Sequence, residues 1–256
     1  PNPVGLAAGL DKNGDYLAGL SKLGFGFIEI GTVTPRAQPG NPKPRLFRLT
    51  RYRSIINRMG FNNLGVDHLL HNLAAFDRGQ RIIGVNIGKN LTTAVDSALD
   101  DYLLLLDRVY PLADYITVNI SSPNTPGLRK LQNDEELEKL LGGIAKRRRM
   151  LEDKHGYQRP VALKIAPDID RSSIGLIADK LQRHQIDALI ATNTTLDRSS
   201  VQGHSLAEQA GGLSGEALKE KSRQVLYDFD QQLQGAIPII SAGGIDSSAE
   251  ARLRLQ

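Results

Sequence analysis

Cysteine is absent from the 256 residues of this chain, and its absence excludes several kinds of site. The chain can form no disulfide bond, no thiolate metal site and no cysteine nucleophile. No apolar run approaches the ~20 residues that a membrane-spanning helix needs. We therefore expect this chain alone to be soluble, and we expect any natural targeting or membrane-docking element to lie outside this sequence.

A strong charge imbalance is also missing. The 32 basic and 28 acidic residues leave a formal net charge of +4, with a pI near 9.3. This balance suits anionic small molecules or an anionic membrane surface and gives no reason to expect nucleic acid as a partner. No G-x-G-x-x-G fingerprint follows an apolar run, so we predict no Rossmann site, and we predict no metal site either.

Short apolar runs recur along the chain, and most are followed by a helical pattern. The predicted strands are Val4–Ala8, Phe25–Val33, Ile82–Ile87, Tyr115–Ile120, Val161–Ile165, Ala188–Thr192 and Ile237–Ala242. The predicted helices are Asp11–Leu23, Thr92–Tyr110, Asp134–Glu152, Ser172–His184, Glu216–Gln234 and Ser247–Leu255. This alternation is typical of parallel βα units.

Seven strands are one fewer than a closed (β/α)8 barrel requires. The barrel is therefore either open or cut short, and we favour the second. We predict an α/β fold of the (β/α)8 TIM-barrel type that lacks its last strand, with residues 1–256 forming a single domain. The proline-rich segment Thr34–Asn63 interrupts the βα rhythm. We interpret it as an insertion on one rim, without a core of its own, in which Leu46–Leu49 and Arg53–Ile56 pair as a small β-hairpin.

Polar residues follow the predicted strand Tyr115–Ile120 directly, in the run Ser121-Ser122-Pro123-Asn124-Thr125-Pro126-Gly127. Barrel enzymes carry their catalytic residues on loops at the carboxyl ends of the strands. A plain surface turn is an equal alternative on local composition. The other predicted strands also end in polar or flexible residues, which favours the catalytic interpretation.

Lys164 is the most informative single residue, because a lysine inside an apolar strand is costly to bury without an anionic partner. A surface strand would also explain it, and Lys12 could simply begin an exposed helix. Asparagines stand at strand ends or on the rim at positions 57, 86, 119, 124 and 193. Each alone could be a turn residue, but together they suggest recognition of a pyrimidine or flavin ring.

Two glycine-rich segments precede predicted helices, Gly211–Gly215 and Gly243-Gly244. Free backbone N–H groups at a helix N-terminus bind anions, so we predict a phosphate site there. The basic run Lys146–Arg149 lies late in a predicted helix, and we interpret it as a solvated face.

Several long motifs together resemble the class 2 (quinone-dependent) dihydroorotate dehydrogenases over nearly the whole chain. They are A-A-G-L-D-K-N-G, G-T-V-T-P-R-x-Q-P-G-N-P-x-P-R, N-R-M-G-F-N-N, V-N-I-S-S-P-N-T-P-G-L-R, L-K-I-A-P-D, A-T-N-T-T, G-G-L-S-G and A-G-G-I. The resemblance implies a flavin mononucleotide (FMN) barrel that oxidises (S)-dihydroorotate to orotate in de novo pyrimidine (UMP) biosynthesis. A quinone would be the final electron acceptor.

The resemblance also implies roles for individual residues. Ser122 would be the general base, handing its proton on through Thr125 or water; class 1 enzymes use a cysteine at this place. The implied substrate-binding residues are Lys12, Asn57, Arg58, Met59, Gly60, Phe61, Asn119, Asn124, Asn193 and Thr194. The implied FMN-binding residues are Ala8, Gly9, Leu10, Asp11, Lys12, Thr32, Asn86, Asn119, Lys164, Thr192, Gly215 and Gly244.

Two family elements have no counterpart in this sequence: the last strand, whose loop completes the phosphate site, and the N-terminal helices of the quinone tunnel. We therefore expect the chain alone to bind FMN weakly or not at all. The resemblance places the full-length protein peripherally on the cytoplasmic side of the inner membrane. Alternatives are a flavin-dependent barrel oxidoreductase with another acceptor and a non-catalytic truncated barrel that retains pyrimidine binding.

Overall fold

The structure is a computed structural model that describes residues 2–255, and its chain divides into two compact units. Unit 1 comprises the residues up to Gly40, Phe61–Asn119 and Glu138–Leu163. Unit 2 comprises Asn41–Gly60, Ile120–Leu137 and the residues from Lys164 onward. Within residues 2–255, no helix combines the length and the apolar character needed to cross a membrane.

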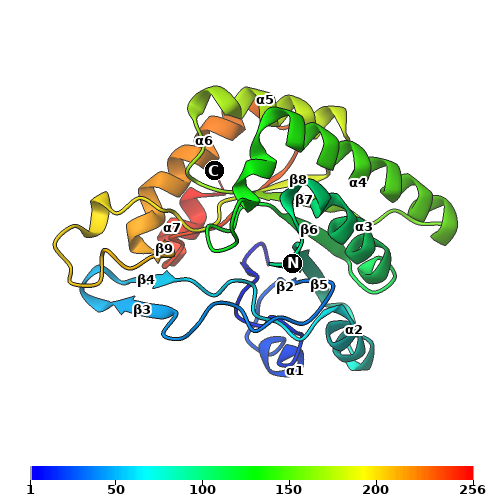
Figure 1. Cartoon of the computed structure of the whole chain (residues 1–256), viewed down its shortest axis with the longest axis horizontal. Helices are drawn as coiled ribbons and strands as arrows, with labels where there is room; N and C mark the ends of the chain where they lie inside the picture. The colour runs from blue at the N-terminus through cyan, green and yellow to red at the C-terminus, as the bar shows by residue number, and fades with distance from the viewer. Residues whose placement is uncertain (1, 256) are drawn as a thin grey trace. The chain divides into compact units, whose positions relative to one another are not determined.

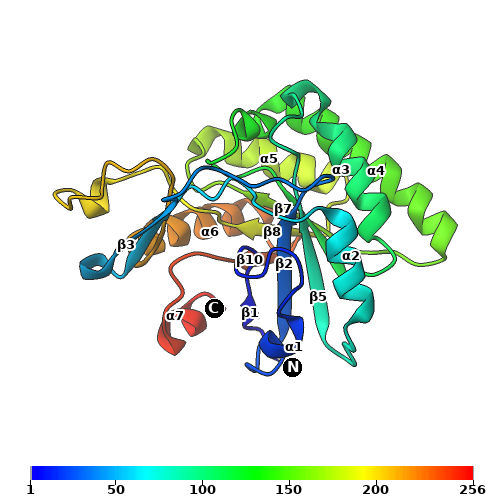
Figure 2. The same ribbon diagram turned by 60° about the horizontal axis from the view of Figure 1, so that its bottom comes forward.

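Unit 1 is built on parallel strands. Its strands are β1 (Gly5–Leu6), β2 (Phe27–Val33), β5 (Ile82–Ile87) and β6 (Tyr115–Asn119), in that order across the sheet. Its helices are α1 (Leu17–Leu20), α2 (Val66–Ala75) and α3 (Ala98–Val109). Figure 2 shows β2 and β5 as neighbouring arrows. These strands are mostly apolar and buried, as expected of a parallel sheet covered by helices, and Glu29, Thr32, Asn86, Thr117 and Asn119 are the buried polar exceptions.

Two elements continue from one unit into the other along the chain. They are α4 (Asp134–His155) and β7 (Val161–Ile165). In unit 2, β8 (Ala188–Ala191) pairs in parallel with β10 (Ile239–Ser241). The helices of unit 2 are α5 (Arg171–Arg183), α6 (Lys219–Leu233) and α7 (Ser248–Leu253), and α5 packs beside α6 (Figure 1). The order β1-β2-β5-β6-β7-β8-β10 confirms the predicted series of seven βα strands.

The predicted hairpin forms in unit 2, but it belongs to a larger sheet. Strands β3 (Leu46–Leu49) and β4 (Ser54–Asn57) are antiparallel, and β9 (Gly212–Gly215) adds a third strand beside β4. The glycines of β9 had suggested only a phosphate-binding loop. Leu49 and Ile56 are fully buried in a small cluster with Val201, Ala207 and Leu213. The insertion therefore has no core of its own, and a distant segment, which the sequence did not indicate, completes one with it.

Helices at the start of the chain differ from the prediction. Asp11–Leu23 forms only the short α1, because the Asp11 carboxylate accepts hydrogen bonds from the backbone N–H groups of Asp15 and Tyr16 and closes a turn instead. The sequence analysis did not predict α2. Its buried residues Val66, Leu69 and Leu73 have the three- and four-residue spacing that marks a helix.

Short 3-10 turns connect several of these elements. They span Thr50–Tyr52, Val95–Ser97, Leu128–Gln132, Ser199–Val201 and Glu216–Leu218.

The basic run on α4 is only partly a solvated face. Lys146 and Arg149 are exposed, and Arg147 is half-buried in an ion pair with Asp107. Arg148 is buried, with 3% of its surface exposed. The interpretation was therefore right for Lys146 and Arg149 and wrong for Arg148.

Gly211 tests the pairing of β9 with β4. Its φ of +134° suits glycine, and a Cβ there would lie 2.3 Å from the carbonyl oxygen of Asn57. We expect Gly211→Ala to lower the free energy of unfolding by about 1–3 kcal/mol, since strained backbone and a clash with a carbonyl group add together. Urea unfolding would measure it. Gly19→Ala is the control: it has an ordinary φ and open space around it, and it should be neutral or stabilising.

Candidate active site

In unit 1, three of the predicted cofactor residues form one buried hydrogen-bonded group. The Asn86 Oδ1 atom accepts from the Thr32 hydroxyl at 2.5 Å and from Asn119 Nδ2 at 3.1 Å, and Asn119 Nδ2 also lies 3.0 Å from Thr32 Oγ1. These residues end β2, β5 and β6, whose parallel register brings them side by side. The structure thus joins side chains that the sequence placed on three separate strands.

Glu29 fixes the orientation of this group and was not predicted. Its carboxylate is 4% exposed and accepts from Asn86 Nδ2 at 2.8 Å, from the Thr117 hydroxyl at 2.8 Å and from the Tyr115 hydroxyl at 3.1 Å. All three partners donate, so the pattern suits an ionised carboxylate. Burial and the Glu29 charge raise the pKa of the Tyr115 hydroxyl, which stays protonated. A glutamate inside the apolar strand Phe27–Val33 was the same signal that identified Lys164.

Glu29→Gln tests whether three donors need a charged acceptor. We expect it to destabilise the protein by about 1–3 kcal/mol, because the new amide turns its N–H₂ group toward existing donors and leaves at least one buried group unsatisfied. The urea midpoint of the variant measures this. An unchanged midpoint would contradict an ionised Glu29. Glu152→Gln, on the last turns of α4, is the control at a less buried carboxylate.

The remaining predicted residues of unit 1 lie near the start of the chain, in Ala8–Lys12, and at the end of the insertion, at Phe61. Gly9 N–H donates to the carbonyl group of Gly31 at 2.8 Å, which extends the pairing of β1 with β2 beyond Leu6. Ala8 and Lys12 are half-buried, and Leu10 is exposed. The Asp11 carboxylate is occupied by backbone N–H groups, so its role in unit 1 is to hold this turn.

Phe61 lies beside Thr32. A Cβ at Gly88 would meet Thr32 Cγ2 at 2.7 Å and the Phe61 ring at 2.9 Å, so both side chains pack on the same glycine. Phe61 is buried and has a φ of +52°. A predicted substrate residue and a predicted cofactor residue therefore share one small region of unit 1.

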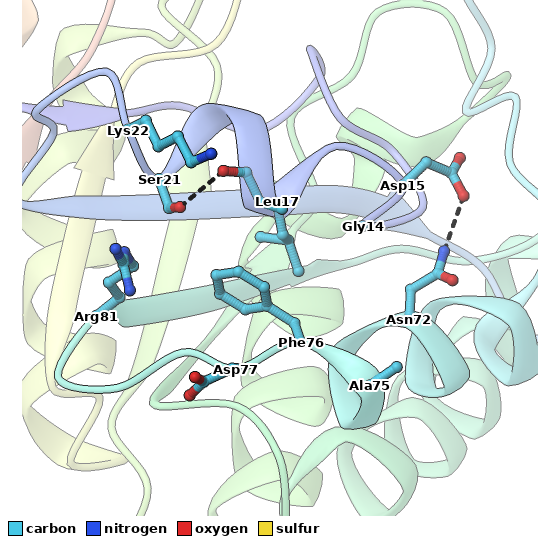
Figure 3. Close-up of a pocket in the computed structure, with 11 residues that line it drawn as sticks. Gly14, Asp15, Leu17, Ser21, Lys22, Asn72, Ala75, Phe76, Asp77 and Arg81 are labelled. Atoms are coloured by element: carbon cyan, nitrogen blue, oxygen red, sulfur yellow. Dashed lines mark hydrogen bonds between the residues drawn. The ribbon is translucent and has the colours of Figure 1, made fainter.

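An open hollow of about 500 Å³ also lies in unit 1, between the α1 region and the end of α2 (Figure 3). Leu17 and Phe76 give it an apolar floor, and Asp15 accepts a hydrogen bond from Asn72 Nδ2 at 2.8 Å on its wall. Burial raises the pKa of Asp15, but hydrogen bonds from His68, Asn13 and Asn72 outweigh it together and lower that pKa. None of the predicted site residues lines this hollow.

In unit 2, the loop after β6 holds Ser122 in a confined position. Ser122 is 5% exposed, and its Oγ accepts a hydrogen bond from the Asn124 backbone N–H at 3.2 Å. The Asn124 side chain donates to the carbonyl group of Asn57 on β4 at 3.1 Å. Thr125 is buried at 3% exposure, and within residues 2–255 no hydrogen bond joins its hydroxyl to Ser122. Two predicted asparagines thus meet at the Ser122 loop.

The loop after β8 meets the Ser122 loop through side chains. Asn193 Nδ2 donates to the Ser121 hydroxyl at 2.9 Å, and Asn193 Oδ1 accepts from the Thr194 N–H at 2.8 Å. The Thr192 hydroxyl, which is buried, donates to the Asn193 carbonyl group at 2.9 Å. Three of the predicted residues are therefore part of one connected loop structure.

The predicted substrate residues Arg58, Met59 and Gly60 lie on the rim insertion, and Arg58 contacts neighbouring protein groups. The Arg58 guanidinium lies 4.6 Å from the centre of the Phe47 ring and donates to Gln209 Oε1 at 2.9 Å. Met59 is half-buried and Gly60 is buried, with a φ of +71°. Gly215 and Gly244 also have positive φ, and a Cβ at either would lie within 2.6 Å of backbone.

Lys164, at the end of β7, differs from the other buried cations of unit 2. It is 7% exposed, and across residues 2–255 its ammonium group has no hydrogen bond or ion pair. The Lys164 side chain is mostly buried, and its ammonium is not among the fully buried atoms that lack a hydrogen-bond partner. An ammonium group without a protein partner suits a ligand that carries negative charge. Within unit 2 the chain thus offers a buried hydroxyl, several carboxamides and the Lys164 ammonium.

Arg129 and Asp168 form a pair that the sequence did not reveal. Arg129 Nη1 donates to Asp168 Oδ2 at 2.8 Å, and Asp168 also accepts from Thr195, Leu196 N–H and Lys221. Burial raises the pKa of Asp168, but hydrogen bonds from these four groups outweigh it and lower that pKa to about 2. Arg129 and Asp168 end two of the quoted motifs, but nothing in the sequence indicates that they pair, because they are 39 residues apart.

The lowered pKa of Asp168 has a consequence for acid stability. A carboxyl whose pKa is depressed in the folded state stabilises it above the unfolded pKa, near 3.8, and loses that contribution as the pH falls toward about 2. We expect Asp168→Asn to be less stable than wild type at pH 7, with the difference narrowing between about pH 4 and pH 2. Urea unfolding across that range measures it. Asp67→Asn, in an exposed ion pair with Arg108, should change stability by only about 0–1 kcal/mol.

Comparison with known proteins gives a consistent result. The family model described as dihydroorotate dehydrogenase matches residues 1–255. The chain is 57% identical over 256 residues to the dihydroorotate dehydrogenase (quinone) of Azoarcus sp. (strain BH72), covering all of this chain and 75% of that protein. It is also 57% identical to the protein of the same name from Aromatoleum aromaticum, covering 73% of it.

Solved structures agree with the strand order. Crystal structures of DHODH from Eimeria tenella, one in complex with ferulenol and one ligand-free, each match with a TM-score of 0.92. Their sequences are 38% and 39% identical to this chain, covering 98% and 99% of it and 72% and 75% of those chains. The predicted α/β fold of the TIM-barrel type without its last strand is thereby confirmed.

Proposed function

This chain belongs to the dihydroorotate dehydrogenase family, and we propose from that premise that it oxidises (S)-dihydroorotate to orotate in de novo pyrimidine (UMP) biosynthesis. A quinone is the final electron acceptor, as in the names of its relatives. The observation that carries the proposal is the buried Ser122 hydroxyl, on a loop held by the carboxamides of Asn124 and Asn193.

Ser122 is proposed as the general base. It removes the proton from C5 of dihydroorotate while a hydride leaves C6, so that a C5=C6 double bond forms. A serine is a weak base at neutral pH, and it must pass its own proton onward as it accepts the new one. Thr125 or water is the proposed next acceptor. Because the two hydroxyls share no hydrogen bond within residues 2–255, a water molecule between them would complete the path.

We propose that the substrate is held by groups that match its ring and carboxylate. Lys12 supplies a cation, and the carboxamides of Asn57, Asn119, Asn124 and Asn193 suit the imide edges. The proposed binding set also includes Arg58, Met59, Gly60, Phe61 and Thr194.

FMN is the proposed cofactor, and when bound it accepts the hydride at N5. The residues present fit it in one respect. The ammonium of Lys164, which has no protein partner within residues 2–255, suits the negative charge of a reduced ring. The proposed FMN set comprises Ala8, Gly9, Leu10, Asp11, Lys12, Thr32, Asn86, Asn119, Lys164, Thr192, Gly215 and Gly244.

We also propose that residues 1–256 act as one flavin-binding domain, supported by the continuity of β7 and α4 between the units and by a family model that matches residues 1–255. Peripheral association of the full-length protein with the cytoplasmic side of the inner membrane is proposed from its quinone-dependent relatives.

Ser122→Ala tests the function directly. The chain is supplied with excess FMN, and dihydroorotate is added without oxygen while the flavin absorbance is followed. We expect the wild-type flavin to bleach and the variant to bleach about 10²–10⁴-fold more slowly at pH 7, because a positioned acid–base group contributes that much. Addition of a quinone should then restore the flavin colour.

The matched control is Ser247→Ala, which changes a serine whose hydroxyl caps α7. It should bleach at the wild-type rate. A Ser122→Ala protein that bleaches at the wild-type rate would show that Ser122 is not the base. A wild-type protein that binds FMN but never bleaches with dihydroorotate would refute the proposed activity.

A further inference from the structure

We propose that the Arg129–Asp168 ion pair is a positioning device for the reaction: it holds the Ser122 loop against the loop that carries Asn193 and Thr194. The inference rests on the proposed role of Ser122. Neither residue is proposed to touch substrate or cofactor.

The Arg129 guanidinium joins three loops of unit 2. Its Nε donates to the carbonyl oxygen of Ser121 at 3.0 Å, and its Nη2 donates to the carbonyl oxygen of Thr194 at 2.8 Å. Its Nη1 donates to Asp168, in the loop after β7. One of these acceptors directly precedes Ser122 in the chain, and another directly follows Asn193. The guanidinium therefore sets the spacing between the proposed base and a proposed substrate amide.

Asp168 holds the guanidinium in place. Its Oδ1 accepts from the Thr195 hydroxyl at 2.5 Å and from Lys221 Nζ at 2.7 Å, and its Oδ2 accepts from the Leu196 N–H at 2.8 Å. The side chains of Arg129 and Asp168 are only 20% and 19% exposed. A carboxylate that accepts from this many donors has little freedom to move. The Arg129 guanidinium, which donates to it, is therefore restrained as well.

The chemistry of arginine suits this role. A guanidinium is planar and presents donors in a fixed fork, so it can bind two carbonyl groups and a carboxylate at set angles. Lysine has the same charge but a single flexible ammonium group, which cannot span three acceptors on three loops. The position of a catalytic group matters strongly, since a displacement of about 1 Å can cost about 10²-fold in rate.

Stability alone does not account for the arrangement. A partly buried ion pair contributes little net stability once its desolvation is counted, and apolar residues often serve as well. Here two of the three guanidinium contacts are with backbone carbonyls beside proposed site residues. A second contact joins two of the same loops. Gln132 Oε1 accepts from the Ala166 N–H at 3.0 Å, which connects the end of the Ser122 loop to the loop that carries Asp168.

The test compares Arg129→Lys with wild type in FMN-loaded protein, by anaerobic flavin reduction with dihydroorotate across pH 6–10. We expect reduction to be about 10–100-fold slower at every pH, with an unchanged pH midpoint, because the charge remains and only the geometry is lost. Arg129→Gln should be slow and should also shift its midpoint to higher pH, because a positive charge near the base is removed.

A double-mutant cycle separates positioning from a general structural effect. If Arg129 acts through Ser122, Arg129→Lys should slow reduction far less in a Ser122→Ala background than in wild type, since the effects of residues that act together are not additive. An undiminished effect in that background would overturn the proposal. So would a wild-type rate in Arg129→Lys. Should Arg129→Lys fail to fold, Asp168→Asn takes its place in the same cycle.

Arg159→Lys is the matched control. Like Arg129, Arg159 donates from its Nε to a backbone carbonyl group, that of Tyr110, at 3.3 Å, and its guanidinium lies over the Tyr157 ring. Unlike Arg129, it donates within residues 2–255 to none of the loops that carry the proposed site residues of unit 2, because it lies before β7 in the chain. We expect a lower thermal midpoint with an unchanged rate. A wild-type rate for Ser122→Ala would instead refute the base assignment on which the proposal rests, so the two failures are distinguishable.

Discussion

Buried polar atoms need partners, and this requirement shapes both units of the chain. In unit 1 the parallel register of β2, β5 and β6 supplies them. Thr32, Asn86 and Asn119 stand at neighbouring strand ends, and each satisfies another. Glu29, which lies three residues before Thr32 on β2, completes this group. Its carboxylate accepts from Asn86 Nδ2 and so fixes the orientation of the Asn86 amide. One ionised group thus determines the orientation of a whole row of neutral ones.

Unit 2 meets the same requirement with loops. In a sheet, the register of the strands decides which side chains are neighbours. In loops, backbone carbonyl groups have no such regular partners, and each buried one needs its own hydrogen-bond donor. Arg129 satisfies two of them, and Asp168 neutralises its charge. Against this background of paired groups, Lys164 stands apart, because its side chain is mostly buried and no protein group within residues 2–255 partners its ammonium, which supports a charged ligand.

The elements that depend on local pattern could be predicted from the sequence. Ile82–Ile87 and Val161–Ile165 match their strands residue for residue, because a strand buried on both faces is a mainly apolar run, here with Asn86 and Lys164 as its polar members. The strand β9 could not be predicted, since two of its four residues are glycine and its partner β4 lies far away in sequence. The short α1 reflects a side chain, Asp11, that closes a competing turn.

In the candidate site, too, residues marked by a local pattern could be predicted, and contacts between distant residues could not. Ser122 and its asparagines were recognisable from one continuous stretch of sequence. Glu29 could have been found by the argument that identified Lys164, a charge inside an apolar strand. The contacts of Arg129 and Asp168 could not be predicted, because only the fold brings Arg129 to the carbonyl group of Thr194, 65 residues further along the chain.

The pairing of β4 with β9 also has a consequence for synthesis on the ribosome. Arg58 and its partner Gln209 are 151 residues apart, so the hairpin emerges long before the strand that completes its sheet. At about 5–20 residues per second, the nascent chain waits roughly 8–30 s. During that interval Leu49 and Ile56 lack the Val201 and Leu213 side chains that later cover them. A chaperone that holds the nascent chain would therefore have these two side chains of the hairpin to shield.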